Sequence, residues 1–188
     1  MGLFGFGKSN NEKCQDWISK GFALYDQEKY EEAIECYDEA IKLDPENLDA
    51  WNNKGITLSR LKKYEEAIEC CDEAIKLDPE NLDAWNGKGA ALRGLEKPEE
   101  SITCFDEAIK LDPENSLTWY GKGGSLYSLE KYEESIKCYD EAIRIDPEFA
   151  AAWSSKGNSL YSLEKYEQSI ECCDKAIKLD PENSAAWI

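Results

Sequence analysis

Residues 51–79, WNNKGITLSRLKKYEEAIECCDEAIKLDP, recur in nearly the same form every 34 residues along the chain. The chain's six tryptophans all keep this step, and each of the first five is followed four residues later by a glycine. The tryptophans are Trp17, Trp51, Trp85, Trp119, Trp153 and Trp187. An Asp-Pro pair, such as Asp78-Pro79, keeps the same period. Such regular self-similarity indicates stacked supersecondary units rather than one globular core.

The period divides the 188 residues into five full units. We place an N-terminal tail at 1–13 and the start of an incomplete sixth unit at 184–188. The predicted units are 14–47, 48–81, 82–115, 116–149 and 150–183.

Each unit contains two segments with helical periodicity. In the second unit, Leu48 to Leu61 has its apolar or small residues at spacings of three and four, beginning with Trp51, and this predicts one helix. Tyr64 to Leu77 has a second apolar stripe. Only Lys62-Lys63 lies between the segments, so the two helices should be antiparallel neighbours. A recurrent mid-helix glycine, such as Gly55, would allow their backbones to approach closely.

The charges fit the second helix of each unit. Glu65 and Glu66 lie in its first turn and Lys76 lies in its last turn, and the charge of each interacts favourably with the helix dipole. We also expect an i,i+4 ion pair between Asp72 and Lys76. The equivalent expected pairs are Asp38/Lys42, Asp106/Lys110, Asp140/Arg144 and Asp174/Lys178.

Over residues 14–183 the chain resembles the tetratricopeptide repeat family, whose pattern also repeats every 34 residues. The Trp, the Gly four residues later, the small residue at Ala67, the residue at Cys71 and the closing Pro79 all match the family pattern. The sequence departs from this pattern at two positions, where the family has Leu and Tyr. These positions hold Lys20, Lys54, Lys88, Lys122 and Lys156, and Leu24, Leu58, Leu92, Leu126 and Leu160. The resemblance implies an all-α, right-handed α-solenoid whose first helices line a concave face that holds other proteins.

Composition excludes several kinds of partner. There are 22 basic and 40 acidic side chains, a net charge of −18, so we expect neither nucleic-acid nor anionic-membrane binding. No apolar run is long enough for a membrane span, and residues 1–8 lack the features of a secretory signal. The eight cysteines are then expected to be free thiols in the cytoplasm.

Catalytic chemistry is not indicated, and we predict that the chain is not an enzyme and has no cofactor or metal site. Histidine, the commonest general base and metal ligand, is absent from the sequence. The recurrent cysteines, such as Cys70, lie at the edge of a helix's apolar stripe and have no Cys-x-x-Cys spacing, so we interpret them as packing residues. Thiol sensing and metal capture are the alternatives.

The concave face of the first helices is the predicted binding site. Positions −2, +1, +5 and +8 from each Trp form one stripe whose residues differ in every unit, as expected for a surface that contacts different parts of one ligand. Neutral drift of unconstrained residues would produce the same variation. Some family members hold a C-terminal carboxylate here, but Asp83 and Gly87 occupy the positions where their third unit is basic. The candidate ligand-binding residues are Tyr25, Asn52, Asn86, Arg93, Tyr120, Tyr127, Asn158 and Tyr161.

The sequence therefore predicts a non-catalytic scaffold that binds a peptide segment of a partner protein in its groove. The main alternative is a self-assembly unit that forms a weak homo-oligomer through its open C-terminal end, where the chain stops soon after Trp187. An enzyme or a thiol sensor is a third, less favoured alternative.

Overall fold

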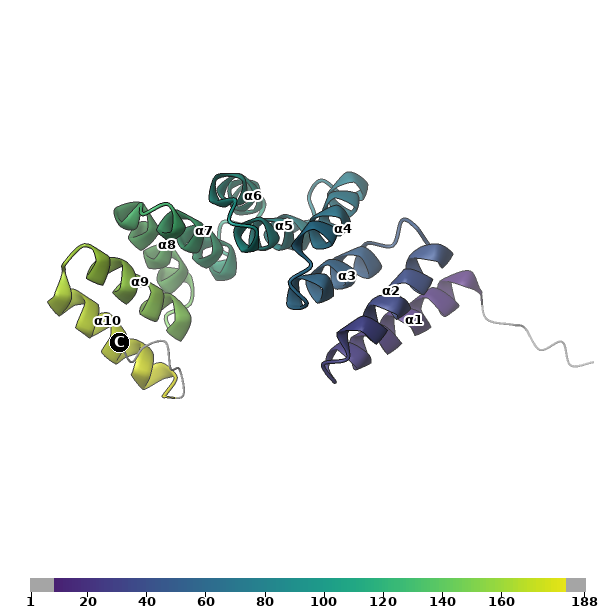
Figure 1. The fold of residues 1–188 in the computed structure, drawn as a ribbon, viewed down its shortest axis with the longest axis horizontal. Helices are drawn as coiled ribbons and strands as arrows, with labels where there is room; N and C mark the ends of the chain where they lie inside the picture. The colour runs from purple at the N-terminus through teal and green to yellow at the C-terminus, as the bar shows by residue number, and fades with distance from the viewer. Residues whose placement is uncertain (1–8, 182–188) are drawn as a thin grey trace, which may run out of the picture. The chain divides into compact units, whose positions relative to one another are not determined.

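A computed structural model describes residues 9–181, and this part of the chain contains helices and no strand. This confirms the predicted all-α fold of successive helix pairs. The helices, shown in Figure 1, are α1 (Asn10–Tyr25), α2 (Tyr30–Leu43), α3 (Leu48–Arg60), α4 (Tyr64–Leu77), α5 (Leu82–Gly94), α6 (Pro98–Leu111), α7 (Ser116–Ser128), α8 (Tyr132–Ile145), α9 (Ala150–Ser162) and α10 (Tyr166–Leu179).

The chain divides into two compact units, Met1–Leu95 and Glu96–Ile188. In the first unit, each helix from α1 to α5 packs against the next one in sequence, and α3 also contacts both α1 and α5. In the second unit, α6 to α10 pack in the same sequential way, and α7 also contacts α9. The division falls inside the predicted repeat 82–115. The predicted repeat boundaries stay predictions.

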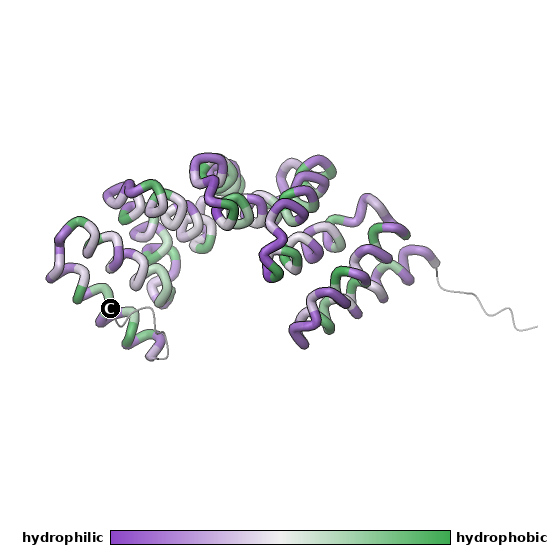
Figure 2. The backbone as a smooth tube through the Cα atoms, in the orientation of Figure 1, coloured by the Kyte–Doolittle hydropathy of each residue, from purple (hydrophilic) through white to green (hydrophobic). Residues whose placement is uncertain are grey.

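Hydrophobic and hydrophilic residues are interspersed along the helices (Figure 2), and the buried residues of α4, which are Ala67, Cys70, Cys71 and Ala74, have the spacing of one helix face. The most deeply buried positions hold small residues: Ala67 and Ala74 of α4 are fully buried, and Ala33 and Ala40 are their equivalents in α2. Small side chains at these positions let neighbouring helices pack closely along their length.

The turn between successive repeats is held by the recurrent Trp, Asp and Pro. Trp51 Nε1 donates a hydrogen bond to the carbonyl oxygen of Pro45, at 2.9 Å, and the side chain of Asp44 accepts from the backbone N–H of Glu46. Asn47 then caps α3 by accepting from the N–H of Ala50. The indole bond recurs as Trp85 to Pro79, Trp119 to Pro113 and Trp153 to Pro147. The Asp-Pro and Trp signals are therefore parts of one hydrogen-bonded turn.

The turn within each repeat contains a non-glycine residue in the left-handed region. Lys62 has φ of 58°, and its equivalents have φ between 58° and 60°. These equivalents are Glu28, Glu96, Glu130 and Glu164. A side chain in this region clashes with its own backbone, so each turn carries local strain.

Helix α1 extends to the N-terminal side of the first predicted repeat, whose boundary at residue 14 stays a prediction. It starts at Asn10, inside the expected tail 1–13, because Ser9 and Glu12 form a capping box in which each side chain bonds the other residue's backbone N–H. The rest of the tail and the predicted start of a sixth unit at 184–188 lie outside the described residues.

The predicted i,i+4 ion pairs are wrong. Lys76 pairs instead with Glu73, three residues away, while Asp72 reaches across to Lys88 of the next repeat at 2.6 Å. Lys42, Lys110 and Arg144 likewise pair with an i−3 glutamate. The Asp is available for the next repeat because its side chain lies on the side of the second helix that faces the following first helix.

Candidate protein-binding surface

Large apolar side chains are exposed along the first helices. We call positions −2, +5 and +8 from each Trp the first-helix face. Five of the nine large hydrophobic residues that are exposed in the described part of the chain lie on it. They are Phe22, Ile56, Leu117, Tyr127 and Tyr161. The face thus carries exposed apolar side chains in spite of the chain's high net charge.

In the compact unit Met1–Leu95, this face carries Phe22 on α1 and Ile56 on α3, which are 54% and 44% exposed. The predicted site residue Tyr25 is half-buried beside them. Its ring packs edge-on against Tyr30, and its hydroxyl accepts a hydrogen bond from Arg60 Nε at 2.9 Å. Tyr25 is therefore held in place by both neighbouring helices.

Asn52 and Asn86, at position +1, are half-buried rather than fully accessible. Asn52 Nδ2 lies 3.4 Å from Asn81 Oδ1, and Asn52 Oδ1 is buried without a hydrogen-bond partner. Asn86 and Arg93, which is also half-buried, both have polar partners. The structure thus brings these three predicted residues toward the helix packing rather than into open solvent.

In the second unit, two tyrosines dominate the face. Tyr127 on α7 and Tyr161 on α9 are 37% and 58% exposed, and each packs edge-on against the first residue of the following helix, Tyr132 or Tyr166. The Tyr127 hydroxyl is 3.5 Å from Ser162 Oγ, which links α7 to the end of α9. Leu117, 65% exposed, lies on the same face of α7.

The other two predicted residues of this unit are less accessible. The ring of Tyr120 packs against Phe149 and Tyr139, with ring centres 5.0 and 5.9 Å away. Asn158 is half-buried, and its backbone carbonyl accepts a bond from Ser162 Oγ. Position +1 therefore contributes mainly to packing: Ile18 and Ser154, its equivalents in α1 and α9, are buried.

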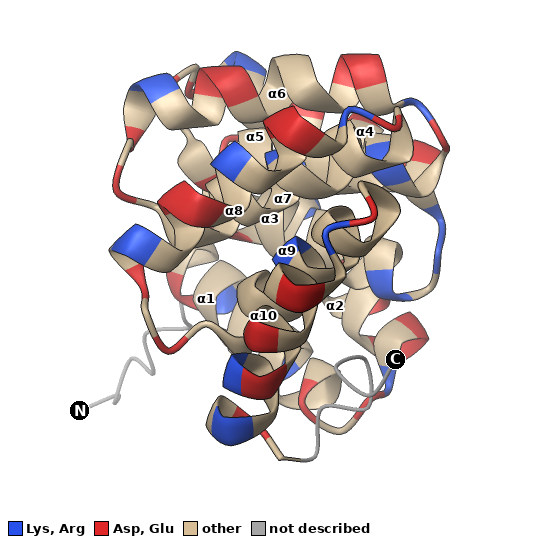
Figure 3. Cartoon of the chain, turned by 90° about the vertical axis from the view of Figure 1, so that its left-hand side faces the viewer, with Lys and Arg blue, Asp and Glu red and all other residues tan. Residues whose placement is uncertain are grey.

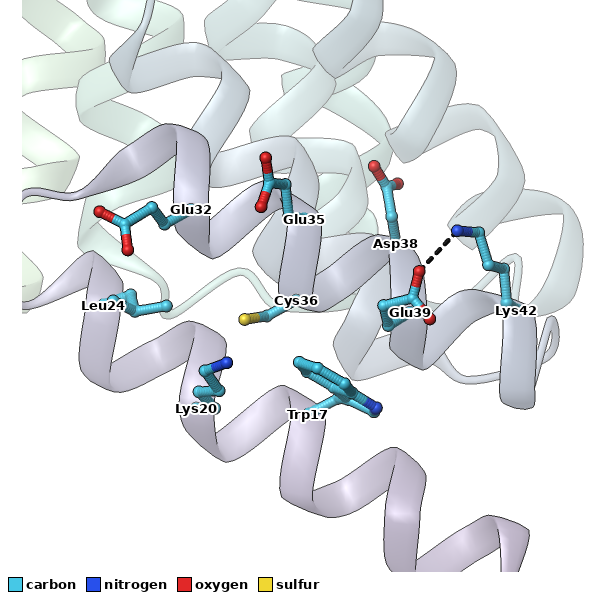
Figure 4. A pocket seen from close by; sticks show the side chains of 9 residues that line it. All are labelled: Trp17, Lys20, Leu24, Glu32, Glu35, Cys36, Asp38, Glu39 and Lys42. Atoms are coloured by element: carbon cyan, nitrogen blue, oxygen red, sulfur yellow. Dashed lines mark hydrogen bonds and ion pairs between the residues drawn. The ribbon is translucent and has the colours of Figure 1, made fainter.

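A separate pocket recurs between the two helices of a repeat. The first copy, of about 350 Å³, is lined by the Trp17 ring, Lys20, Leu24 and Cys36, with carboxylates of α2 at its rim (Figure 4). A second copy, of about 530 Å³, is lined by the equivalent residues of α3 and α4. Two rim carboxylates of the first copy are already paired, Glu39 with Lys42 and Asp38 with Lys54.

The cysteines are packing residues. Seven are buried, and Cys173 is half-buried. Burial raises the pKa of the Cys70 and Cys138 thiols to about 11, so both remain protonated at neutral pH. Among residues 9–181, no three His, Cys, Asp or Glu side chains are grouped so that they could hold a metal ion.

Along α10, the acidic residues Glu167, Glu171 and Asp174 precede the basic residues Lys175 and Lys178, as Figure 3 shows. Within the described residues, no helix is long and apolar enough to cross a membrane.

Antiparallel helix pairs that recur every 34 residues and expose an apolar face on their first helices define a helical repeat protein of the interaction-module class. Family models described as "Tetratricopeptide repeat" and "TPR repeat" match the sequence. The first matches residues 48–81, 82–115 and 150–183, and the second matches residues 21–62 and 123–162. The chain belongs to the tetratricopeptide repeat family. No curated protein matches its sequence.

Solved structures show the same fold at low sequence identity. MamA (residues 41 to the end) from Desulfovibrio magneticus RS-1 is 19% identical, with a TM-score of 0.79 over 94% of this chain and 99% of that one. YrrB, a tetratricopeptide repeat protein described as having an unusual peptide-binding site, is 22% identical, with a TM-score of 0.71 over 96% of each chain. Pseudomonas aeruginosa PilF is 19% identical, with a TM-score of 0.83 over 95% of this chain and 82% of that one.

Sequence reasoning missed Phe22, Ile56 and Leu117, which lie on the predicted stripe but were not selected as site residues. The signal was a large apolar side chain at a position where other repeats have Ala, Gly or Asp. It also missed the role of the recurrent Lys. Lys54 pairs with Asp38, 16 residues earlier in the chain, and the equivalent Lys–Asp pairs of the other repeats have the same separation.

Proposed function

We propose that the chain is a non-catalytic scaffold whose first-helix face binds an extended segment of a partner protein. The observation that carries the proposal is the exposure of large apolar side chains on the first helices of each compact unit: Phe22 and Ile56 in Met1–Leu95, and Leu117, Tyr127 and Tyr161 in Glu96–Ile188. Burial of such side chains contributes most of the free energy of a typical interface.

The aromatic anchors of this face are partly preorganised. The edge-on contacts of Tyr127 with Tyr132 and of Tyr161 with Tyr166 restrict the rings before a ligand arrives. A ligand that packs on them therefore loses less side-chain entropy than it would on free rings. An apolar segment with a few basic residues fits best, because the chain carries a net charge of −18. The cytoplasmic location expected from the free thiols stays a prediction.

The test begins with a random peptide library selected on the wild-type chain, followed by fluorescence anisotropy with the selected labelled peptide. Tyr127→Ala combined with Tyr161→Ala should weaken its binding at least ~10-fold, or ~1.4 kcal/mol. Leu111→Ala is the matched control, because Leu111 has similar exposure, 38%, but lies on a second helix. Its affinity should stay unchanged.

Equal losses in the control and the double variant would place the binding surface elsewhere. Peptides released by raised salt alone, with no effect of the tyrosine substitutions, would assign binding to the acidic surface and contradict the proposal.

A further inference from the structure

An ion pair joins successive repeats at four junctions. Lys54 on α3 pairs with Asp38 on α2 at 2.6 Å, and the same distance separates the other three pairs. These are Lys88–Asp72, Lys122–Asp106 and Lys156–Asp140. Each lysine is only 21–25% exposed, so the pair is partly shielded from solvent.

The lysine of this pair has an equivalent without an ion-pair partner on α1, and the aspartate has one on α10. Lys20 occupies the lysine position of α1, and Asp174 occupies the aspartate position of α10. Neither has an ion-pair partner among residues 9–181. Lys20 is exposed and rests over the Trp17 ring, 4.8 Å from its centre. Two complementary charges are thus left without their usual contact.

We call the contact between a second helix and the first helix of the next repeat an inner junction. The face of α10 that corresponds to such a contact, its outer face, has the same apolar residues. Ile170 is 61% exposed and Tyr166 is 47% exposed, whereas the equivalent Ile34 and Tyr30 of α2 are half-buried. In the first unit, Ile34 belongs to the partly buried shell of a core cluster that includes Leu58 of the next first helix. The face of α10 therefore has the composition of a surface that receives a first helix.

The outer face of α1 has the small residues that such a surface accepts. At inner junctions, position +2 faces the large or sulfur-containing residue of the preceding helix: a Cβ at Gly121 would lie 2.5 Å from the Phe105 ring, and one at Gly87 would lie 3.1 Å from Cys71 Sγ. Ser19 holds this position in α1 and is exposed.

Position +6 of the first helices also holds small residues, which are buried at inner junctions and exposed on α1. It holds Thr57, Ala91, Ser125 and Ser159, all fully buried, whereas Ala23 in α1 is exposed. The half-buried Cys173 of α10 is small, so the exposed Ser19 and Ala23 of α1 fit against it without the clash that an aromatic side chain would cause.

We propose that α10 of one copy of this chain packs against α1 of a second copy, with Asp174 and Lys20 forming the ion pair found at the inner junctions. The contact joins two different faces, so it is heterologous and leads to head-to-tail assembly into chains or rings rather than to a two-fold dimer. A single helix junction is small, so association is weak and concentration-dependent.

One residue of α1 opposes the contact. Position −1 of the first helices holds the buried Ala50, Ala84, Thr118 and Ala152, but α1 has the exposed Asp16. In the contact, its carboxylate approaches the negative C-terminal end of α10, where Asp180 also lies. Asp16→Ala should therefore strengthen association, a gain that nonspecific adhesion would not show.

The test is analytical ultracentrifugation of the full 188-residue chain from about 1 μM to about 1 mM at low salt. The weight-average mass should rise with concentration. Lys20→Asp or Asp174→Lys alone should weaken the association constant about 10-fold, and the double exchange Lys20→Asp/Asp174→Lys should restore most of it. Ile170→Glu should abolish association while leaving the circular dichroism spectrum unchanged.

Matched controls exclude the effect of net charge. Lys29→Asp makes the same charge change at the N-cap of α2, where Asp is favoured, and Glu164→Lys makes it in a turn where another repeat has Lys62. Leu117→Glu adds a charge at an equally exposed apolar residue on the first-helix face. None of these should change the association constant.

Three results would overturn the proposal. They are a monomer at every concentration, a double exchange that restores nothing, and controls that weaken association as much as the test variants. A monomer that becomes an oligomer only when residues 182–188 are removed would assign the α10 face to the chain's own C-terminal segment. Apart from the Leu117 control, none of the variants changes the first-helix face. The test of peptide binding and the test of self-association can therefore fail independently of each other.

Discussion

A Cβ atom added to Gly123 of α7 would lie 2.6 Å from Cε1 of Tyr139 on α8, a distance that real Cβ atoms essentially never show. The same relationship joins Gly21 to Tyr37, and a Cβ added to Gly157 would lie 2.9 Å from Cys173 Sγ. The recurrent glycine therefore makes room for the residue 16 positions later, which is why both recur with the same period.

We expect Gly123→Ala to lower the free energy of unfolding by about 2 kcal/mol, because the buried Tyr139 ring has no free space into which to move. Gly124→Ala is the control. Its position holds Phe22, Ile56 and Ala90 in other repeats, so the change should stabilise the helix by about 0.5–1 kcal/mol. Urea denaturation measures both, and equal midpoints for the two variants would contradict the steric explanation.

The inter-repeat ion pair should contribute measurably to stability. In a double-mutant cycle with Lys122→Met and Asp106→Asn, we expect a coupling of about 0.5–1 kcal/mol, near the top of the range for surface pairs, because Lys122 is only 22% exposed. The exposed i,i+3 pair Lys110–Glu107 serves as the comparison and should show a smaller coupling. Coupling that persists unchanged in 1 M salt would show that packing, rather than charge, links the two residues.

The strained turn residues offer a route to stabilisation. Glu130 has φ of 59°, so Glu130→Gly should raise the free energy of unfolding by about 0.5–1 kcal/mol. Glu133→Gly is the control, because Glu133 lies in the first turn of α8, where glycine should destabilise. Thermal melts followed by circular dichroism measure both. A lower melting temperature for Glu130→Gly would mean that the Glu130 side chain makes a stabilising contact.

The buried thiols predict a loss of stability at high pH. Burial raises the pKa of Cys70 and Cys138 from 9.0 to about 11, so the folded state holds these protons when the unfolded state releases them. Stability is therefore complete below pH 9 and falls as the pH rises toward 11, by roughly 2 kcal/mol per thiol. Urea denaturation at pH 8 to 11 should show a shallower fall for the Cys70→Ala/Cys138→Ala variant. Parallel curves would show that the thiols contribute nothing to the pH dependence.

The helix pairs could be predicted in detail because their determinants are local. Pro98 begins α6, Leu48 begins α3 and Tyr64 begins α4, as the spacing, the turn residues and the proline indicate. The start of α1 at Asn10 is also set locally, by the capping box of Ser9 and Glu12.

The candidate surface could be predicted only in part. The predicted stripe on the first helices stays a prediction, and which of its positions are accessible depends on how neighbouring repeats pack. Position +1 turns toward the next helix, so Tyr120 contacts Phe149, whereas Phe22 at position +5 remains exposed. Periodicity gives the direction of a side chain around one helix, and it contains no information on the neighbour that covers it.

By itself, the sequence determined the helical repeats, their 34-residue period and their turns, because hydrophobic spacing, helix caps and proline act over a few residues. The tertiary structure alone decided the ion-pair partners. From Asp72, the sequence offers Lys76 four residues away and Lys88 sixteen residues away, and helix geometry alone favours the nearer one. Packing of α4 against α5 brings Lys88 Nζ to 2.6 Å from Asp72, in a partly buried position where charges attract more strongly than they do in open solvent.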